Sequence, residues 1–410
     1  MVLFTQREWL LPLTFLLVWQ TALAQPSGYK SQREEAGSFN HQLGLEYRPA
    51  WVIPSDPFYR TEYSPELDMG PARSGHLKYA FSFPDGSLGA QVFPHTHQGI
   101  GLALFDVGNR KELGTPVAWY LFQRSRIAGI SRRLSLDYEW NFGLSAGWNP
   151  YDPATNPNNI IVGSKLNAYI NLGASLRWQL TRRVALTGGV DFTHFSNGNT
   201  EYPNAGVNLP GIKLGVIHDL SASKLETHEQ EAAPQPPPFS RHVSYDLVIF
   251  GSTRRKGVDF FGAQVASPYK YPVVGAYFAP MYNWGYCLRT GLSLDAIYDG
   301  GANVYTEDYI VGTEQQFFRP GWEYQTALGL SARLDYVMPI FTIGVGIGTP
   351  VLHKGGDFRS TYQAFALKVR ATRNAFIHIG YSLSDFHDPN YLMLGFGYRF
   401  NNRAPYLLAR

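Results

Sequence analysis

The longest regular pattern in this sequence is a strict alternation of apolar and polar positions from residue 134 to residue 148. One set of positions is apolar: Leu134, Leu136, Tyr138, Trp140, Phe142, Leu144, Ala146 and Trp148. The positions between them are all polar or glycine: Ser135, Asp137, Glu139, Asn141, Gly143, Ser145 and Gly147. Side chains of a β-strand point alternately to its two faces, so this segment is predicted to be a strand with one apolar face. It is longer than the ~9 to 11 residues with which a strand crosses a bilayer, which favours a membrane strand.

Further segments repeat this pattern. In residues 166–178 the apolar set is Leu166, Ala168, Ile170, Leu172, Ala174, Leu176 and Trp178. Other strands are predicted at 77–83, 99–105, 117–122, 184–193, 212–216, 242–250, 262–266, 273–278, 286–297, 324–336, 340–347, 362–369, 375–383 and 391–400. The sequence therefore predicts an all-β protein, an antiparallel transmembrane β-barrel of the outer membrane. One barrel of roughly 12 to 16 strands is expected from strand and chain length, with a tandem of two smaller barrels as the alternative.

The composition agrees with a barrel. Aromatic residues make up 15% and charged residues 16% of the 410 residues, and 41 residues are glycine. Average soluble domains carry ~25% charged residues, whereas outer-membrane barrels use girdles of aromatic side chains. The formal net charge of +3 is too small to indicate nucleic-acid binding, and the single cysteine, Cys287, excludes a disulfide within the chain.

The two ends of the chain carry export and assembly signals. Residues 1–24 have the features of a signal peptide: Arg7 before an apolar core at 10–19, then Ala22-Leu23-Ala24 as the cleavage site. The last predicted strand ends in the aromatic Phe400 and resembles the assembly signal of outer-membrane barrels. The predicted location is the outer membrane of a Gram-negative bacterium, and the barrel assembly machinery is an expected partner.

Two segments break the strand pattern. Residues 25–75 are mixed and Pro-rich, with a weak strand at 42–47, and no role is assigned to them. The barrel is predicted to span 76–402. Within it, 221–242 contains an acidic stretch followed by five residues of which four are proline, at 234–238, which predicts a solvent-exposed loop.

Residues 184–196 combine a strand with candidate catalytic groups. The even positions Val184, Leu186, Val190 and Phe192 are apolar, and the same register continues to His194 and Ser196. A histidine and a serine two residues apart on a strand project from one face, where the imidazole can accept the hydroxyl proton as a general base. Because that face is apolar, the pair is predicted to face outward, towards a lipid substrate.

His194-Phe195-Ser196-Asn197, followed by Pro203-Asn204-Ala205-Gly206, resembles the signature of the PagL-type lipid A 3-O-deacylases of the acyloxyacyl hydrolase family, which are outer-membrane β-barrel esterases. The resemblance covers residues 90–220. It implies that Ser196 is the nucleophile and His194 its base. It also implies that Asn197, Gly198 and Asn204 lie near the oxyanion site.

One position departs from the family pattern. Asn208 stands where the family has a glutamate that orients the histidine. An amide oxygen can accept the imidazole N–H and fix its tautomer, but it cannot offset the charge of an imidazolium. Three outcomes are open: weaker activity, replacement by another carboxylate such as Glu201, or loss of catalysis. Asp191 is not expected to replace the glutamate, because its odd position points to the other face.

The predicted function is removal of an ester-linked acyl chain from lipid A or a related outer-leaflet glycolipid, with no metal and no cofactor. The alternative is a non-catalytic barrel, porin-like or structural, with a decayed site. His95 and His97 could share a face, but no carboxylate or cysteine lies at ligand spacing from them.

There is also a weak internal similarity. Thr181-Arg182 before the candidate strand is echoed by Thr372-Arg373, and Pro203-Asn204 by Pro389-Asn390. In this register Asp385 and His387 take the places of His194 and Ser196, so the second copy lacks the nucleophile. Duplication and chance both account for the similarity.

Overall fold

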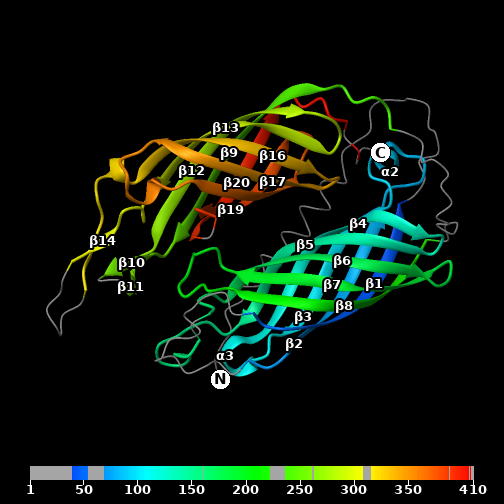
Figure 1. Cartoon of the computed structure of the whole chain (residues 1–410), viewed down its shortest axis with the longest axis horizontal. Coiled ribbons are helices and arrows are strands. Elements are labelled where there is room, and N and C mark those ends of the chain that lie inside the picture. The colour runs from blue at the N-terminus through cyan, green and yellow to red at the C-terminus, as the bar shows by residue number, and fades with distance from the viewer. Residues whose placement is uncertain are drawn as a thin grey trace, which may run out of the picture.

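The computed structural model describes residues 39–53, 69–159, 161–221, 236–260, 263–307, 315–386, 388–405 and 407. The predicted signal peptide at 1–24 and most of the predicted Pro-rich loop at 221–242 lie outside the described residues. Within them the chain is almost entirely antiparallel β-structure, so the all-β prediction is confirmed (Figure 1). No helix in the described part of the chain is long and apolar enough to cross a membrane.

The first eight strands close into a barrel in which each strand pairs with its neighbour in sequence. They are β1 (Asn40–Ala50), β2 (Ala72–Ser82), β3 (Thr96–Asp106), β4 (Gly114–Ser131), β5 (Leu134–Trp148), β6 (Leu166–Gln179), β7 (Val184–Ser196) and β8 (Val207–Asp219). The barrel closes where β8 pairs with β1, with Asp219 opposite Gln42. Its connections contain two short helices, α2 (Leu88–Val92) and α3 (Arg110–Leu113).

Eight further strands close into a second barrel. They are β9 (His242–Arg254), β12 (Tyr271–Asn283), β13 (Leu288–Asp299), β16 (Thr326–Val337), β17 (Phe341–Leu352), β18 (Tyr362–Arg370), β19 (Ala375–Ser384) and β20 (Asp388–Phe400). This barrel closes where β20 pairs with β9, with Phe400 opposite Tyr245. Its connections contain two hairpins, β10 (Gly257–Phe260) with β11 (Ala263–Ala266) and β14 (Tyr305–Thr306) with β15 (Phe317–Phe318), and two 3-10 turns, η2 (Trp322–Tyr324) and η3 (Gly356–Phe358).

The expectation of a single barrel is wrong, and the tandem of two smaller barrels is what the structure shows. The two barrels together contain the sixteen strands that a single large barrel would need, so the strand count alone does not separate the two cases. The difference lies in which edges pair. β8 pairs with β1 and not with β9. The alternation of apolar and polar residues within a strand does not show which other strand it pairs with.

The N-terminal boundary of the barrel is also corrected. The barrel begins at Asn40, not at residue 76, because β1 and the first part of β2 lie in the segment to which no role had been assigned. The weak strand predicted at 42–47 is the centre of β1. Its alternation is hard to recognise in the sequence because its inward positions include the charged Glu46 and Arg48, which pair with each other inside the barrel.

The internal similarity joins equivalent elements of the two barrels. β7 is the seventh strand of the first barrel, and β19 is the seventh strand of the second. Asp385, which takes the place of His194 in that register, lies beyond the end of β19 in a left-handed backbone conformation, with φ of 48°. His387 lies outside the described residues. The topological match favours duplication over chance as the origin of the similarity.

Both barrels are apolar outside and polar inside. Outward side chains such as Leu45, Val190 and Phe396 are 63%, 62% and 74% exposed. In the first barrel, inward charges form a buried network in which Lys213 pairs with Glu139 at 2.8 Å. In the second barrel, the same arrangement pairs Arg289 with Asp246 and Lys368 with Asp335, each at 2.8 Å. Pairing offsets part of the cost of removing these charges from water, and it fills each lumen at this level.

The connections differ in length at the two ends. At one end the turns are short, for example residues 132–133 and 180–183 in the first barrel and 338–340 and 371–374 in the second. The connections at the other end are mostly longer, and the hairpins β10–β11 and β14–β15 lie there (Figure 1). Outer-membrane barrels have short periplasmic turns and longer extracellular loops, which assigns the long loops of both barrels to the cell exterior.

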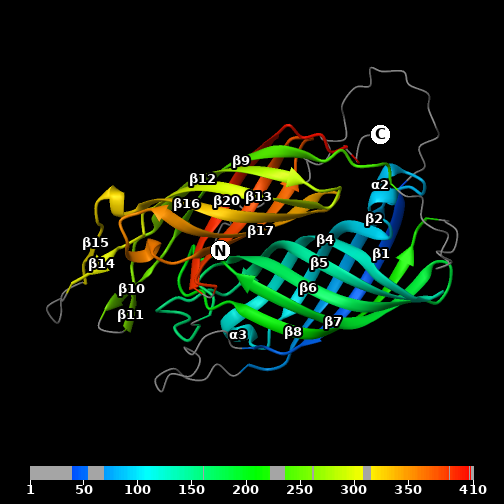
Figure 2. The ribbon, with the colours of Figure 1, turned by 45° about the horizontal axis from the view of Figure 1, so that its top comes forward.

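The two barrels lie side by side (Figures 1 and 2). Their outer faces meet at β5, where Phe142 packs against a cluster that contains Met338, Phe341 and Leu367 of the second barrel. The Tyr138 hydroxyl on the same strand lies 3.4 Å from the Tyr336 hydroxyl. The second barrel therefore covers part of the outer face of the first.

Candidate active site

The candidate pair lies at the extracellular end of β7. As predicted, its even positions point outward and its odd positions inward, so Val190 and Phe192 are exposed and Asp191 and Thr193 are buried. Between His194 and Ser196, the ring of Phe195 points into the lumen and is 1% exposed. Because adjacent side chains on a strand point to opposite faces, this buried ring holds His194 and Ser196 on the outer face.

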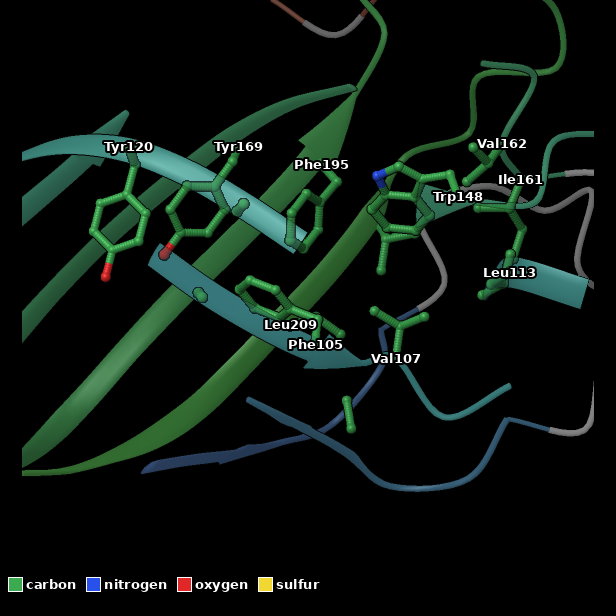
Figure 3. Close-up of a cluster of buried hydrophobic side chains, with 14 of the residues drawn as sticks. Phe105, Val107, Leu113, Tyr120, Trp148, Ile161, Val162, Tyr169, Phe195 and Leu209 are labelled. Carbon is green, nitrogen blue, oxygen red and sulfur yellow. The ribbon is translucent and has the colours of Figure 1, made fainter. Parts of the chain in front are cut away.

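An aromatic cluster inside the barrel fixes Phe195 (Figure 3). Its ring centroid lies 5.0 Å from those of Trp148 and Phe105, both in edge-to-face geometry, and 5.4 Å from that of Tyr169. Such pairs add to the stabilisation from burial alone. The end of β7 is therefore anchored from within the barrel.

His194 is held by the neighbouring strand. It lies directly opposite Asn208 of β8, and its Nδ1 is 2.6 Å from the Asn208 Oδ1. An amide oxygen only accepts hydrogen bonds, so this contact places the imidazole hydrogen on Nδ1 and leaves Nε2 as the basic nitrogen. Gly206 closes one side of the ring, since a methyl group there would come within 3.0 Å of the imidazole Cε1.

Ser196 shares the outer face with His194 and is opposite Ala168 of β6. Its hydroxyl makes no hydrogen bond to His194 or to any other group in the described part of the chain. In ligand-free sites such catalytic contacts are often long and shorten only when substrate binds. The two candidate side chains are two residues apart on the same face of β7.

The loop after Ser196 is held mainly by its own asparagines. The side-chain oxygen of Asn204 accepts the backbone N–H of Asn197 at 3.0 Å, and its amide donates to Asn199 Oδ1 at 3.0 Å. The Asn197 amide donates to the carbonyl of Glu201 at 3.1 Å. The predicted oxyanion residues are therefore together, but Asn197 and Asn204 are engaged in shaping the loop. The backbone N–H of Gly198 has no partner among the described residues.

The outer surface around the pair is apolar. Phe192, Ile170 and Leu166 on β7 and β6 are 46%, 37% and 51% exposed. At the extracellular end of a membrane barrel, such a surface contacts the acyl chains of the outer leaflet. His194 and Ser196 therefore lie on the apolar outer face of the barrel, beside these side chains.

The other acidic candidates lie elsewhere. Asp191 points inward and pairs with Arg48 at 2.8 Å, as its odd position predicts. Glu201 pairs with Arg255 at 3.0 Å and also with Lys270, so it does not take the place of the family glutamate. In the described part of the chain no group of three or more histidine, cysteine or acidic side chains could hold a metal ion.

Two features of the site were not predicted from the sequence. One is Gly206, whose contact with His194 depends on the path of the loop between β7 and β8. The other is the contact of this loop with the second barrel, through Arg255 and Asn390. Contacts of this kind join segments far apart in the chain, and nothing in the local pattern of either segment indicates them.

The fold and the site define the class of protein: an outer-membrane β-barrel with an outward-facing serine and histidine at its extracellular rim. Residues 128–216 match the family model of the lipid A 3-O-deacylases (PagL), and residues 243–402 match the C-terminal domain of acyloxyacyl hydrolase (PagL_C). The two matches do not overlap, and together they cover more than half of the chain. Two parts of the chain therefore match models of the PagL-type family, and the resemblance seen in the sequence is confirmed.

Solved structures of single barrels are similar to part of the chain. The outer-membrane enzyme PagL shares 14% identity over 42% of this chain and 97% of its own, with a TM-score of 0.30. Neisserial surface protein A shares 9% over 44% of this chain and 96% of its own, with a TM-score of 0.29. The N-terminal barrel of Pseudomonas aeruginosa OprF shares 10% over 44% and 99%, with a TM-score of 0.26. No curated protein matches the sequence significantly.

Proposed function

We propose that this protein is an outer-membrane esterase that removes an ester-linked acyl chain from lipid A or a related glycolipid. The observation that carries the proposal is the outward position of His194 and Ser196 at the extracellular rim, with the Asn208 oxygen 2.6 Å from the histidine Nδ1. A lipid substrate lies in the membrane outside the barrel, so an esterase acting on it needs its nucleophile on that face. The match of residues 128–216 to the lipid A 3-O-deacylases supports the same substrate class.

In the proposed mechanism, Ser196 attacks the acyl carbonyl carbon while His194 Nε2 takes the hydroxyl proton. The tetrahedral oxyanion accepts a hydrogen bond from the Gly198 N–H, a backbone donor of this loop that has no partner among the described residues. Collapse of the tetrahedral intermediate breaks the bond to the sugar oxygen, and the imidazolium gives its proton to that oxygen, which leaves as a hydroxyl group. Water, activated by His194, then attacks the acyl-serine and releases the fatty acid.

Asn208 limits this mechanism without preventing it. Its oxygen fixes the tautomer that leaves Nε2 basic. It carries no charge, so it stabilises the imidazolium formed during attack less than a carboxylate would. We therefore expect slower turnover than a histidine paired with glutamate would give.

The test is mass spectrometry of lipid A from outer membranes of a host that expresses either the wild-type chain or Ser196→Ala. Barrel levels are matched by the fraction of folded protein. Loss of one acyl chain only with the wild type is the expected result. Unchanged lipid A with both folded proteins would rule out deacylation of that substrate and favour a barrel with a decayed site.

A further inference from the structure

The loop that follows Ser196 is bonded to the second barrel. The backbone N–H of Arg255, directly after β9, donates to the carbonyl oxygen of Asn199 at 2.9 Å. The side-chain amide of Asn199 donates to the carbonyl oxygen of Asn390 on β20 at 3.4 Å. The tip of the loop is thus joined to two strand ends of the other barrel.

An ion-pair cluster reinforces this connection. The Glu201 carboxylate lies 3.0 Å from Arg255 Nε and also pairs with Lys270, the residue directly before β12. The Glu201 side chain is 27% exposed, so water screens the pairs only in part. Both cations belong to the second barrel, whereas the carboxylate belongs to the loop of the first.

The second barrel also packs directly against Gly198. A methyl group at this glycine would lie 3.2 Å from Leu392 Cδ1 and 3.5 Å from a ring carbon of Tyr381. Gly198 has a φ of 66°, a conformation that favours glycine. The peptide that carries the proposed oxyanion donor is therefore bounded by outward side chains of β19 and β20.

From these contacts we infer that the second barrel is a positioning part of the esterase site, acting through Glu201 and Asn199 on the loop that presents the Gly198 N–H. The inference rests on the proposed function and deepens it. Bonds among Asn197, Asn199 and Asn204 fix the shape of the loop, while the contacts with the second barrel fix where the loop lies. An oxyanion donor is effective only at about 2.7–3.1 Å from the developing charge, so the placement of the loop controls the rate.

The inference is tested with Glu201→Gln and Arg255→Ala in the full-length chain, assayed on lipid A in detergent micelles. Glu201→Gln removes the charge but retains the size, and Arg255→Ala retains the backbone donor to Asn199. Each substitution is expected to lower kcat about 10- to 100-fold with KM changed less than about threefold, because a small misplacement of catalytic groups costs rate. The double variant is expected to be no slower than the slower single variant, because both break the same connection.

Lys256→Ala is the matched control. Lys256 is adjacent to Arg255 but pairs with Asp357 of its own barrel, so wild-type kcat is expected. If Glu201→Gln and Arg255→Ala also retain wild-type kcat while Ser196→Ala is inactive, the proposed function stands and the inference is overturned. If the folded wild-type chain does not deacylate lipid A, the proposed function fails, and the inference fails with it.

Discussion

Asn208 stands where the resemblance leads us to expect a glutamate, and the structure shows which contact its side chain makes with His194. Its side-chain oxygen still meets the histidine Nδ1, at 2.6 Å. The contact therefore still orients the His194 ring and fixes its tautomer. It does not supply the negative charge that a glutamate would. Of the alternatives that the sequence left open, replacement by Glu201 is not observed, because Glu201 pairs with Arg255 and Lys270.

Substitutions at Asn208 separate orientation from charge. Asn208→Ala removes the acceptor and is expected to lower kcat about 10- to 100-fold, a fraction of what a positioned base contributes. Asn208→Glu supplies the missing charge and is expected to raise kcat about tenfold, which corresponds to about 1.4 kcal/mol of added transition-state stabilisation. Steady-state kinetics on lipid A, with His194→Ala as the inactive reference, measure both. Wild-type kcat in Asn208→Ala would show that the contact does not position His194.

At this scale the sequence predicted the directions of side chains well. The parity of positions along β7 placed His194 and Ser196 outward and Asp191 inward, because successive side chains of a strand point to opposite faces. The sequence did not predict which of the oxyanion candidates would already be engaged in hydrogen bonds within the loop. The hydrogen bond from the Asn197 N–H to Asn204 depends on the fold of a loop with an irregular backbone, and no periodic signal describes such a loop.

At the scale of one element, β7 owes its fixed position to Phe195 as much as to its hydrogen bonds. The buried ring contacts three aromatic side chains, from β3, β5 and β6. The candidate catalytic residues His194 and Ser196 are on the opposite face of the same strand. Packing inside the barrel is thereby coupled to the placement of groups outside it.

Phe195→Ala tests this coupling. Removing a buried aromatic ring is expected to lower the free energy of unfolding by about 3–5 kcal/mol. Phe195→Leu keeps most of the volume and is expected to cost less than about 1.5 kcal/mol. Urea unfolding of the refolded protein in lipid vesicles gives both values. Equal stability of the two variants would contradict an anchoring role for the ring.

Among the elements, the two strands with uninterrupted alternation, β5 and β6, were predicted with little error. β4 and β8 were predicted only in part, at 117–122 and 212–216. β5 occupies residues 134–148, as the alternation predicts. β1 was predicted only in part, because its inward face carries Glu46 and Arg48, which look like loop residues until the buried network inside the barrel gives them partners.

At the scale of the whole molecule, the buried ion pairs inside the two barrels argue against the porin-like alternative. Lumen-facing charges that line an open pore would favour a porin-like protein, and inward charges are present in both barrels. They are paired with one another instead of lining an open passage, as in the contacts of Lys213 with Glu139 and of Arg399 with Asp246. An electrostatic network of this kind occupies the space through which ions would pass.

Conductance across a planar lipid bilayer provides the test. The reconstituted wild-type protein is expected to give no stable current above that of the bare bilayer, because each lumen is blocked by buried ion pairs. A general porin inserted under the same conditions serves as the positive control. Reproducible conductance steps from this protein would contradict blocked lumens and favour the porin-like alternative.

The closure of each barrel could not be predicted, since one strand's pattern does not show which edge it pairs with. The closed eight-stranded units nevertheless have a consequence for how such a chain can grow. In each, the first and last strands pair, so the chain enters and leaves at the same end. A gene for one barrel can therefore be fused to a copy of itself, and the new barrel inserts in the correct orientation without any linker having to thread the membrane. Duplication therefore requires no change in the topology of either barrel. After it, one copy can lose its nucleophile and be selected for supporting the other.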